Sequence, residues 1–147
     1  MPSHSETRIV PYTADCMFAI VADVEKYPEF LPWVLGTRTV HRESDTVFHS
    51  EMRVGFAGIE ERYTSRVVLD PTERTIDVAL LEGPFRRLEN HWRFKPRGDV
   101  CLVDFSIAFE FESIVLNAIA GKTFGHVFLR MADAFEAQAK AMSNQLA

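Results

Sequence analysis

The sequence predicts an α+β fold, in which a curved antiparallel sheet of six to seven strands packs against one long C-terminal helix. Three observations predict this class. Hydrophobicity alternates with a period of two from Val34 to Glu112, short turn sequences interrupt this alternation, and apolar residues recur at helical spacing after Ser113. The chain has 147 residues, of which 47% are hydrophobic. We therefore expect one domain over residues 1–147 with a core of its own.

The first elements are a short strand near Glu6–Val10 and a helix that begins after Thr13. Thr13 is a suitable N-cap, and the apolar residues that follow have the i, i+3, i+4, i+7 spacing of one helix face: Met17, Ile20, Val21 and Val24. We expect this helix to end before Pro28, because the residue before a proline avoids the helical region. The aromatic connection 27–33 follows, either as an exposed lip or as a plug over the end of the core.

The middle of the chain is predicted to form an antiparallel meander. Its clearest strands are 88–95 and 101–112, where apolar and polar residues alternate most regularly. Four weaker strands are expected before them, near Leu35–His41, Val47–Val54, Ile59–Leu69 and Ile76–Leu81. The separators are short and rich in Gly, Pro, Asp and Ser, which favours hairpins over longer crossovers.

The last element is a predicted helix from near Ser113 to about Ser143. Its apolar residues step by three or four: Ala120, Phe124, Phe128, Met131, Phe135, Ala139 and Met142. This face is the only large apolar cover available for the sheet. Gly121 and Gly125 weaken a helix and predict a bend or a close approach.

Composition and charge narrow the function classes. The chain has 16 Lys and Arg against 21 Asp and Glu, a net charge of −5. Non-specific nucleic-acid binding depends on basic residues, so we expect no DNA partner. The stretch Ser113–Gly121 is far shorter than the roughly 20 residues of a membrane-spanning helix. No secretory signal begins the sequence and no CxxC pair occurs, so we expect a cytoplasmic location with Cys16 and Cys101 reduced.

The usual catalytic motifs do not occur in the sequence. It has no GxSxG, no phosphate-binding glycine loop and no HExxH, and its five histidines are scattered. We therefore predict no catalytic residue, no metal site and no covalent or metal cofactor. Glu61 beside Tyr63 is one alternative, since a desolvated carboxyl group can act as an acid or base.

Seventeen aromatic rings, from 12 Phe, 2 Trp and 3 Tyr, must be placed in a small protein. A twisted sheet that grips one helix can leave an apolar chamber between them, or the rings can fill this space as solid core. Alternation also places a few polar residues on inward faces: Ser50, Glu61, Ser65 and Asn90. Such groups either orient a bound ligand or satisfy the backbone.

A basic rim is predicted between residues 86 and 97, where five cations accompany only Glu89: Arg86, Arg87, Arg93, Lys95 and Arg97. This local charge of +4 could contact anionic lipid headgroups or nucleic acid. The alternative is a solvated strand whose charges prevent edge pairing.

Several runs, taken together, resemble a known family: 27–33 (YPEFLPW), 63–67 (YTSRV), 82–88 (EGPFRRL) with 92–94 (WRF), 109–111 (FEF) and the Phe128–Phe135 helix segment. The chain resembles, over about residues 4–142, the coenzyme Q-binding START-like family of the polyketide cyclase/START superfamily. The bacterial ribosome-association toxin belongs to the same group. One departure is Gln138, where the family pattern usually places an arginine.

The resemblance implies a helix-grip fold with two short helices after the first strand. It implies non-enzymatic binding of a hydrophobic ligand, with ubiquinone or a related polyprenyl quinone as the natural candidate, in support of respiratory electron transfer. Peripheral contact with the inner membrane would follow. The alternatives are an interaction protein that binds ribosomal subunits and an enzyme of the polyketide cyclase type.

Because of this resemblance, we favour the hypothesis of an apolar chamber over that of a solid core. Its predicted lining combines inward aromatic and aliphatic residues: Phe30, Leu31, Trp33, Met52, Phe56, Leu88, Trp92, Phe105, Phe109, Phe124, Phe128 and Met131. Tyr63, Ser65 and Asn90 are the candidate polar contacts to the ligand.

Overall fold

The computed structural model describes the chain except residues 1–2, 57, 119–125, 128–129 and 147, and except the side chains of residues 56 and 144–146. Its elements, in chain order, are β1 (Ser3–Val10), α1 (Ala14–Ala22), the 3₁₀ helix η1 (Val24–Glu29), β2 (Val34–Arg42), β3 (Val47–Phe56), β4 (Ile59–Asp70), β5 (Thr75–Glu82), β6 (Phe85–Arg97), β7 (Val100–Phe111) and α3 (Met131–Leu146). The chain is also helical over 114–118.

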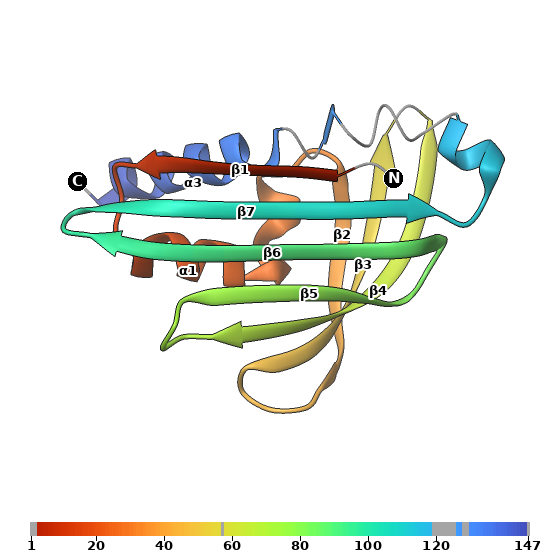
Figure 1. Cartoon of the computed structure of the whole chain (residues 1–147), viewed down its shortest axis with the longest axis horizontal. Coiled ribbons are helices and arrows are strands. Elements are labelled where there is room, and N and C mark those ends of the chain that lie inside the picture. Colours follow the sequence, from red (N-terminus) through yellow and green to blue (C-terminus); the bar gives the residue numbers. More distant parts are fainter. Residues whose placement is uncertain (1–2, 57, 119–125, 128–129, 147) are drawn as a thin grey trace.

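The described strands form one antiparallel sheet of seven, in the order β1-β7-β6-β5-β4-β3-β2, which confirms the predicted fold class. Strands β2 to β7 form the expected meander. Strand β1 is the edge strand opposite β2. It pairs with β7, from Ser3 opposite Ala108 to Val10 opposite Cys101. Figure 1 shows the sheet bending, so that β2, β3 and β4 run steeply across the direction of β6 and β7.

Two short helices follow β1, as the family resemblance implied. Thr13 caps α1, and its Oγ1 accepts a hydrogen bond from the Cys16 backbone N–H at 3.1 Å. The helix ends before Pro28 as expected, but it ends at Ala22, so the expectation that Val24 belongs to it is wrong. The chain leaves the helical region at Asp23, and Pro28 lies inside η1, where a 3₁₀ turn of six residues tolerates it.

The C-terminal cover is present, but its bounds differ from the prediction. Ser113 caps the turn 114–118 as expected, since its Oγ accepts from the Leu116 N–H at 3.1 Å. A continuous helix to Ser143 is wrong at Arg130, which forms a turn whose N–H binds Val127 O, and α3 begins only at Met131. The predicted bend at Gly121 and Gly125 lies outside the described residues.

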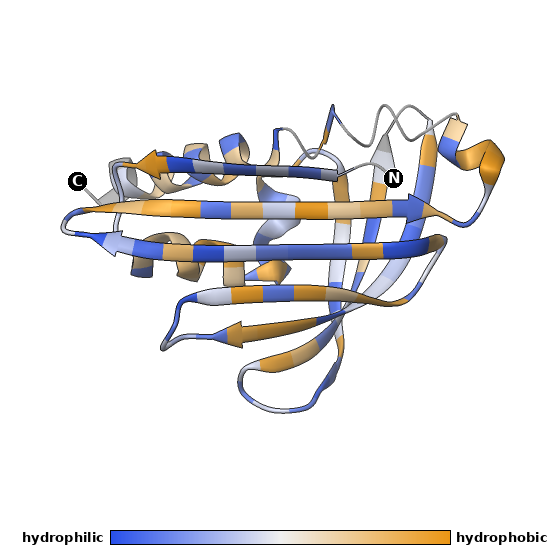
Figure 2. Ribbon diagram, viewed as in Figure 1, coloured by the Kyte–Doolittle hydropathy of each residue, from blue (hydrophilic) through white to orange (hydrophobic). Residues whose placement is uncertain are grey.

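The core lies between the inner face of the sheet and the helices. In Figure 1, α1 and α3 lie at the same end of the sheet, where β6 turns into β7. Figure 2 shows β7 largely in hydrophobic colours and β6 largely in hydrophilic ones, because β6 is rich in charged residues. Large inward rings are fully buried on these two strands, among them Trp92, Phe94, Phe105 and Phe109.

An ion network fastens α3 to the edge of the sheet. Arg8 on β1 lies 2.7 Å from Asp133 and 3.3 Å from Glu136, both on α3. Its guanidinium also binds Glu6 on the same strand at 2.7 Å. These partners raise the pKa of Arg8 against the effect of its partial burial, so the group stays charged. These ion pairs therefore link α3 to the edge strand β1.

Glu43, in the loop after β2, joins two neighbouring strands on the outer face. It accepts hydrogen bonds from Arg66 at 2.8 Å and from His49 at 2.7 Å, and these bonds lower the pKa of its carboxyl group from 4.5 to about 2. A carboxyl group with a depressed folded-state pKa stabilises the fold above its unfolded pKa, and this contribution disappears as the pH falls through the folded pKa.

We therefore expect Glu43→Gln to flatten the acid branch of the stability curve between about pH 4.5 and about pH 2. Urea unfolding of both proteins at several pH values measures this difference. All other carboxyl groups are shared, so they cancel in the comparison. Parallel curves across this range would show that Glu43 gains nothing from Arg66 and His49.

Candidate functional site

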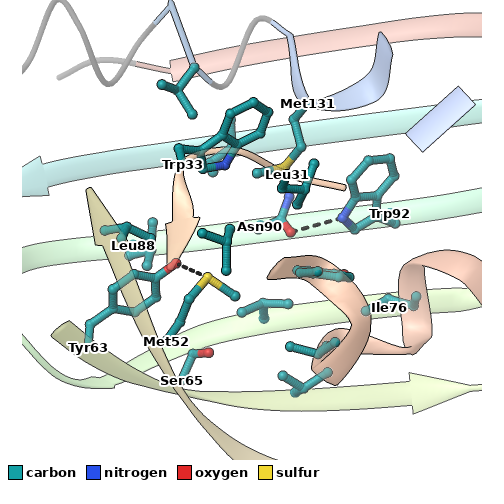
Figure 3. A pocket seen from close by; sticks show the side chains of 18 of the residues that line it. Leu31, Trp33, Met52, Tyr63, Ser65, Ile76, Leu88, Asn90, Trp92 and Met131 are labelled. Carbon is teal, nitrogen blue, oxygen red and sulfur yellow. Dashed lines mark hydrogen bonds between the residues drawn. The ribbon is translucent and has the colours of Figure 1, made fainter. Parts of the chain in front are cut away.

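An apolar cavity lies between the inner face of the sheet, η1 and the C-terminal segment (Figure 3). Its volume is about 70 Å³. Nine of the predicted site residues line it: Leu31, Trp33, Met52, Tyr63, Ser65, Leu88, Asn90, Trp92 and Met131. The interior is therefore neither solid nor widely open, and the void that exists lies where the alternation of β3, β4 and β6 placed it.

Three predicted residues do not line the cavity. Phe105 and Phe109 point inward from β7 but pack against other rings of the core. The ring centroids of Phe105 and Trp92 are 4.4 Å apart, and those of Phe109 and Phe111 are 6.0 Å apart. Phe30 packs against Phe135 and lines a groove on the outer side. Phe124, Phe128 and the Phe56 side chain lie outside the described part of the chain.

Sequence reasoning missed other lining residues. Tyr27 and Phe135 both border the cavity, as do several aliphatic residues: Val24, Val34, Val54, Val67, Ile76, Val78, Ile107 and Val127. Phe135 belonged to the helical apolar stripe and Tyr27 to the aromatic run, so the signal for both was present. Small β-branched residues carry no comparable signal, because every inward strand position favours them.

The described lining contains no Lys, Arg, His, Asp or Glu. Its polar atoms come from Ser65, Asn90, two tyrosines and two indoles. Burial raises the pKa of both Tyr27 and Tyr63, so each hydroxyl stays neutral. An anionic headgroup would find no counter-charge here, and burying an unpaired charge is very unfavourable.

Asn90 is occupied by the protein itself. Its Oδ1 accepts a hydrogen bond from Trp92 Nε1 at 2.9 Å, and its Nδ2 donates to the Ser106 carbonyl at 3.0 Å (Figure 3 shows the first). The amide therefore fixes the indole and ties β6 to β7. We interpret Asn90 as a structural group and not as the primary contact for a ligand.

Tyr63 is held more weakly. Its hydroxyl donates to the Met52 sulfur at 3.2 Å, and a thioether is a weak acceptor. A carbonyl oxygen of a ligand could replace this sulfur with a gain in hydrogen-bond strength. The hydroxyl does not engage Glu61, so the structure gives no support to an acid–base pair of these two residues.

The position of Tyr63 depends on two neighbours. Its ring meets Phe85 edge-on at 5.3 Å between centroids. Gly83, in the turn between β5 and β6, has φ +152°, and a Cβ atom added there would lie 2.5 Å from the Tyr63 Cβ. Only glycine permits this close approach of the turn to the tyrosine.

The predicted basic rim is partly neutralised. The register of the sheet brings acidic residues from the neighbouring strand: Arg86 lies 3.6 Å from Glu110, and Lys95 lies 3.0 Å from Asp104. Arg87 binds Glu89 at 2.8 Å. Counting Glu110 and Asp104 with Glu89 lowers the local charge from +4 to +2, since three carboxylates now face five cations.

Two other rim residues keep their outward position. Arg93 and Arg97 are exposed on the outer face of β6, and Arg93 stands opposite Asp104 in the register with β7. The described residues contain no group of three or more His, Cys, Asp or Glu side chains that could hold a metal ion. Nor does any helix among them have the length and apolar character needed to cross a membrane.

The family model for polyketide cyclase/dehydrase and lipid transport matches residues 10–136. The chain belongs to this family. This confirms the superfamily resemblance seen in the sequence, and the gripped helix and seven-stranded sheet are the helix-grip architecture of START-like proteins.

Named relatives and a solved structure are similar along most of the chain. The ribosome association toxin RatA of Rickettsia prowazekii is 34% identical, with 95% of this chain and 97% of that protein covered. The coenzyme Q-binding protein COQ10 homolog B of Xenopus laevis, a mitochondrial protein, is also 34% identical, with 92% of this chain but only 57% of that protein covered. The solution structure of the 18 kDa protein CC1736 from Caulobacter crescentus is 40% identical, with a TM-score of 0.78 over 98% of this chain and 99% of that one.

The structural role of Asn90 predicts a specific cost. In Asn90→Leu the buried Trp92 N–H loses its acceptor, and we expect a loss of about 1–3 kcal/mol in the free energy of unfolding. Urea unfolding followed by tryptophan fluorescence measures it. In a Trp92→Phe background the same change should cost clearly less, because no indole N–H remains. Equal losses in both backgrounds would contradict this role.

Proposed function

We propose that the chain binds a neutral, largely apolar small molecule in the cavity between sheet and C-terminal segment. Ubiquinone, or a related polyprenyl quinone, is the leading candidate ligand. The observation that carries the proposal is a largely apolar cavity whose described lining contains no Lys, Arg, His, Asp or Glu and includes one weakly engaged hydroxyl, that of Tyr63. Further support comes from the relative COQ10 homolog B, which is named as a coenzyme Q-binding protein.

The cavity must widen to take such a ligand. Its volume of about 70 Å³ is smaller than the roughly 150 Å³ cavity that holds a benzene ring in another protein. Met52 and Met131 lie on facing sides of it, and unbranched thioether side chains adapt readily to new shapes (Figure 3). When Met52 moves, the Tyr63 hydroxyl is released to donate to a ligand carbonyl.

In this proposal the protein is a carrier and not an enzyme. It shields the ring of a quinone from water and presents it at the inner membrane, which it touches peripherally from the cytoplasm, in support of respiratory electron transfer. An enzyme of the cyclase type would need acid or base groups facing the bound molecule, and the described lining offers only neutral hydroxyl, amide and indole groups.

The proposal is tested by extracting the purified protein with organic solvent and identifying released molecules by mass spectrometry. A prenyl quinone should be recovered, and titration of the emptied protein with ubiquinone should quench the fluorescence of Trp33 and Trp92, which both line the cavity. Repeated extraction without a quinone, together with no change on titration, would reject the proposal.

Tyr63→Phe removes the proposed hydrogen bond while keeping the ring. We expect the dissociation constant for ubiquinone to rise about three- to tenfold, as one neutral hydrogen bond is worth about 1 kcal/mol. Fluorescence titration measures it. Tyr12→Phe is the matched control, since Tyr12 packs on the core but does not line the cavity. Equal affinities of the two variants would remove Tyr63 from the site.

A second candidate function is association with ribosomal subunits, and the name of the RatA relative supports it. The protein would then use the outer face of β6, where Arg93 and Arg97 are exposed. Sedimentation with purified subunits tests this. Contacts to phosphates should weaken steeply between low and high salt, and Arg93→Glu should reduce co-sedimentation severalfold. Binding that ignores both salt and Arg93 would exclude this face.

A further inference from the structure

Three aromatic rings form a thin wall on one side of the cavity. Tyr27 from η1 and Phe135 from α3 border the cavity, and Phe30 closes behind them. The centroid of Phe30 lies 5.4 Å from that of Phe135 and 6.0 Å from that of Tyr27, all packed edge-to-face. These packed rings therefore lie between the cavity and the space that Phe30 lines.

A groove of about 540 Å³ begins on the other side of this wall. It is lined by residues of α1, η1 and α3, and α1 contacts α3 at one end of the sheet (Figure 1). Its apolar floor consists of Ala19, Ile20, Phe30 and Met142, with the Cys16 thiol beside them. Met142 is one of the exposed large hydrophobic residues of the chain.

We propose that this groove is the binding site for the prenyl tail of the ligand whose ring occupies the cavity. The inference rests on the proposed function. Its first support is size and position. The cavity can widen around a ring, but a long tail has to lie elsewhere, and Phe30, which lines the groove, packs directly on Phe135, which lines the cavity.

Its second support is charge. The charged residues along the groove are Asp23, Lys26 and Glu29, and Lys26 is already paired with Glu29 at 3.5 Å. Gln138 adds a neutral amide from α3. With one cation against two carboxylates, the groove does not attract a fatty acid or a prenyl phosphate, whereas a neutral hydrocarbon tail can lie on its floor.

A movement of α3 would connect the cavity and the groove. Phe30 follows η1 directly, and Tyr27 is anchored through its hydroxyl to the Val21 carbonyl of α1. Phe135 belongs to α3. Movement of α3 away from η1 therefore separates Phe135 from the other two rings and opens a path from the cavity into the groove.

Cys16 provides a direct readout of groove occupancy. It is half-buried in the groove, whereas Cys101 is buried in the core, so alkylation of the folded protein reports on Cys16. Burial raises the pKa of the Cys16 thiol, so the reaction is followed at mildly alkaline pH. Two probes are compared: a long-tailed ubiquinone and an analogue with the same ring and a single isoprene unit. Mass spectrometry counts the label.

We expect the long-tailed quinone to slow Cys16 alkylation at least about fivefold, and the short-tailed analogue to leave the rate nearly unchanged although it binds. If both quinones bind by tryptophan fluorescence and neither protects Cys16, the groove assignment is wrong while the proposed function stands. If neither quinone binds, the proposed function itself fails and the groove assignment falls with it.

A second variant tests the same point by filling the groove. Ala19 is exposed on α1, so Ala19→Trp is compatible with folding, which circular dichroism verifies. The affinity for the long-tailed quinone should fall at least about tenfold, and that for the short-tailed analogue should stay within about twofold. Ala137→Trp, on an exposed site of α3 outside the groove, is the control. Equal effects on both quinones would overturn the assignment.

Discussion

The buried indole of Trp92 determines how far the sheet stands from its helical cover. It lies flat beside Phe94 on its own strand, meets Phe105 on β7 at 4.4 Å and Phe135 on α3 at 5.2 Å, and has its N–H fixed by Asn90. One rigid side chain therefore joins two strands and a helix. Because the indole fills the space at one end, the remaining gap at the other end persists as a cavity beside Tyr63 and Met52.

The fold could be predicted almost entirely, because each strand has one buried face and its period of two is strong. The alternation of β7, in which every second residue is buried, reproduces the pattern read from the sequence. The breaks were harder to predict. The helical spacing of apolar residues continues through the turn at Arg130, so the sequence does not indicate that turn. The spacing from Met17 to Val24 is likewise regular, although α1 gives way to η1 at Asp23.

The site was predicted less completely, for physical reasons. Alternation identifies the face of a strand but not the depth at that position, so Phe105 and a true lining residue such as Leu88 had the same signature. Charges along β6 were misjudged because their partners, Glu110 and Asp104, lie on a strand that becomes a neighbour only in the folded sheet. Polar groups gave the same ambiguity: only the structure separates the saturated Asn90 from the lightly held Tyr63.

The close contact between Gly83 and Tyr63 couples the hairpin that joins β5 and β6 to the interior of the protein. A side chain at position 83 would push against Tyr63 and shift its phenol ring relative to the cavity. The position of Tyr63 in the cavity therefore depends on a hairpin residue that does not itself line the cavity. Gly83 in this hairpin thus controls the position of a hydroxyl donor inside the protein, that of Tyr63.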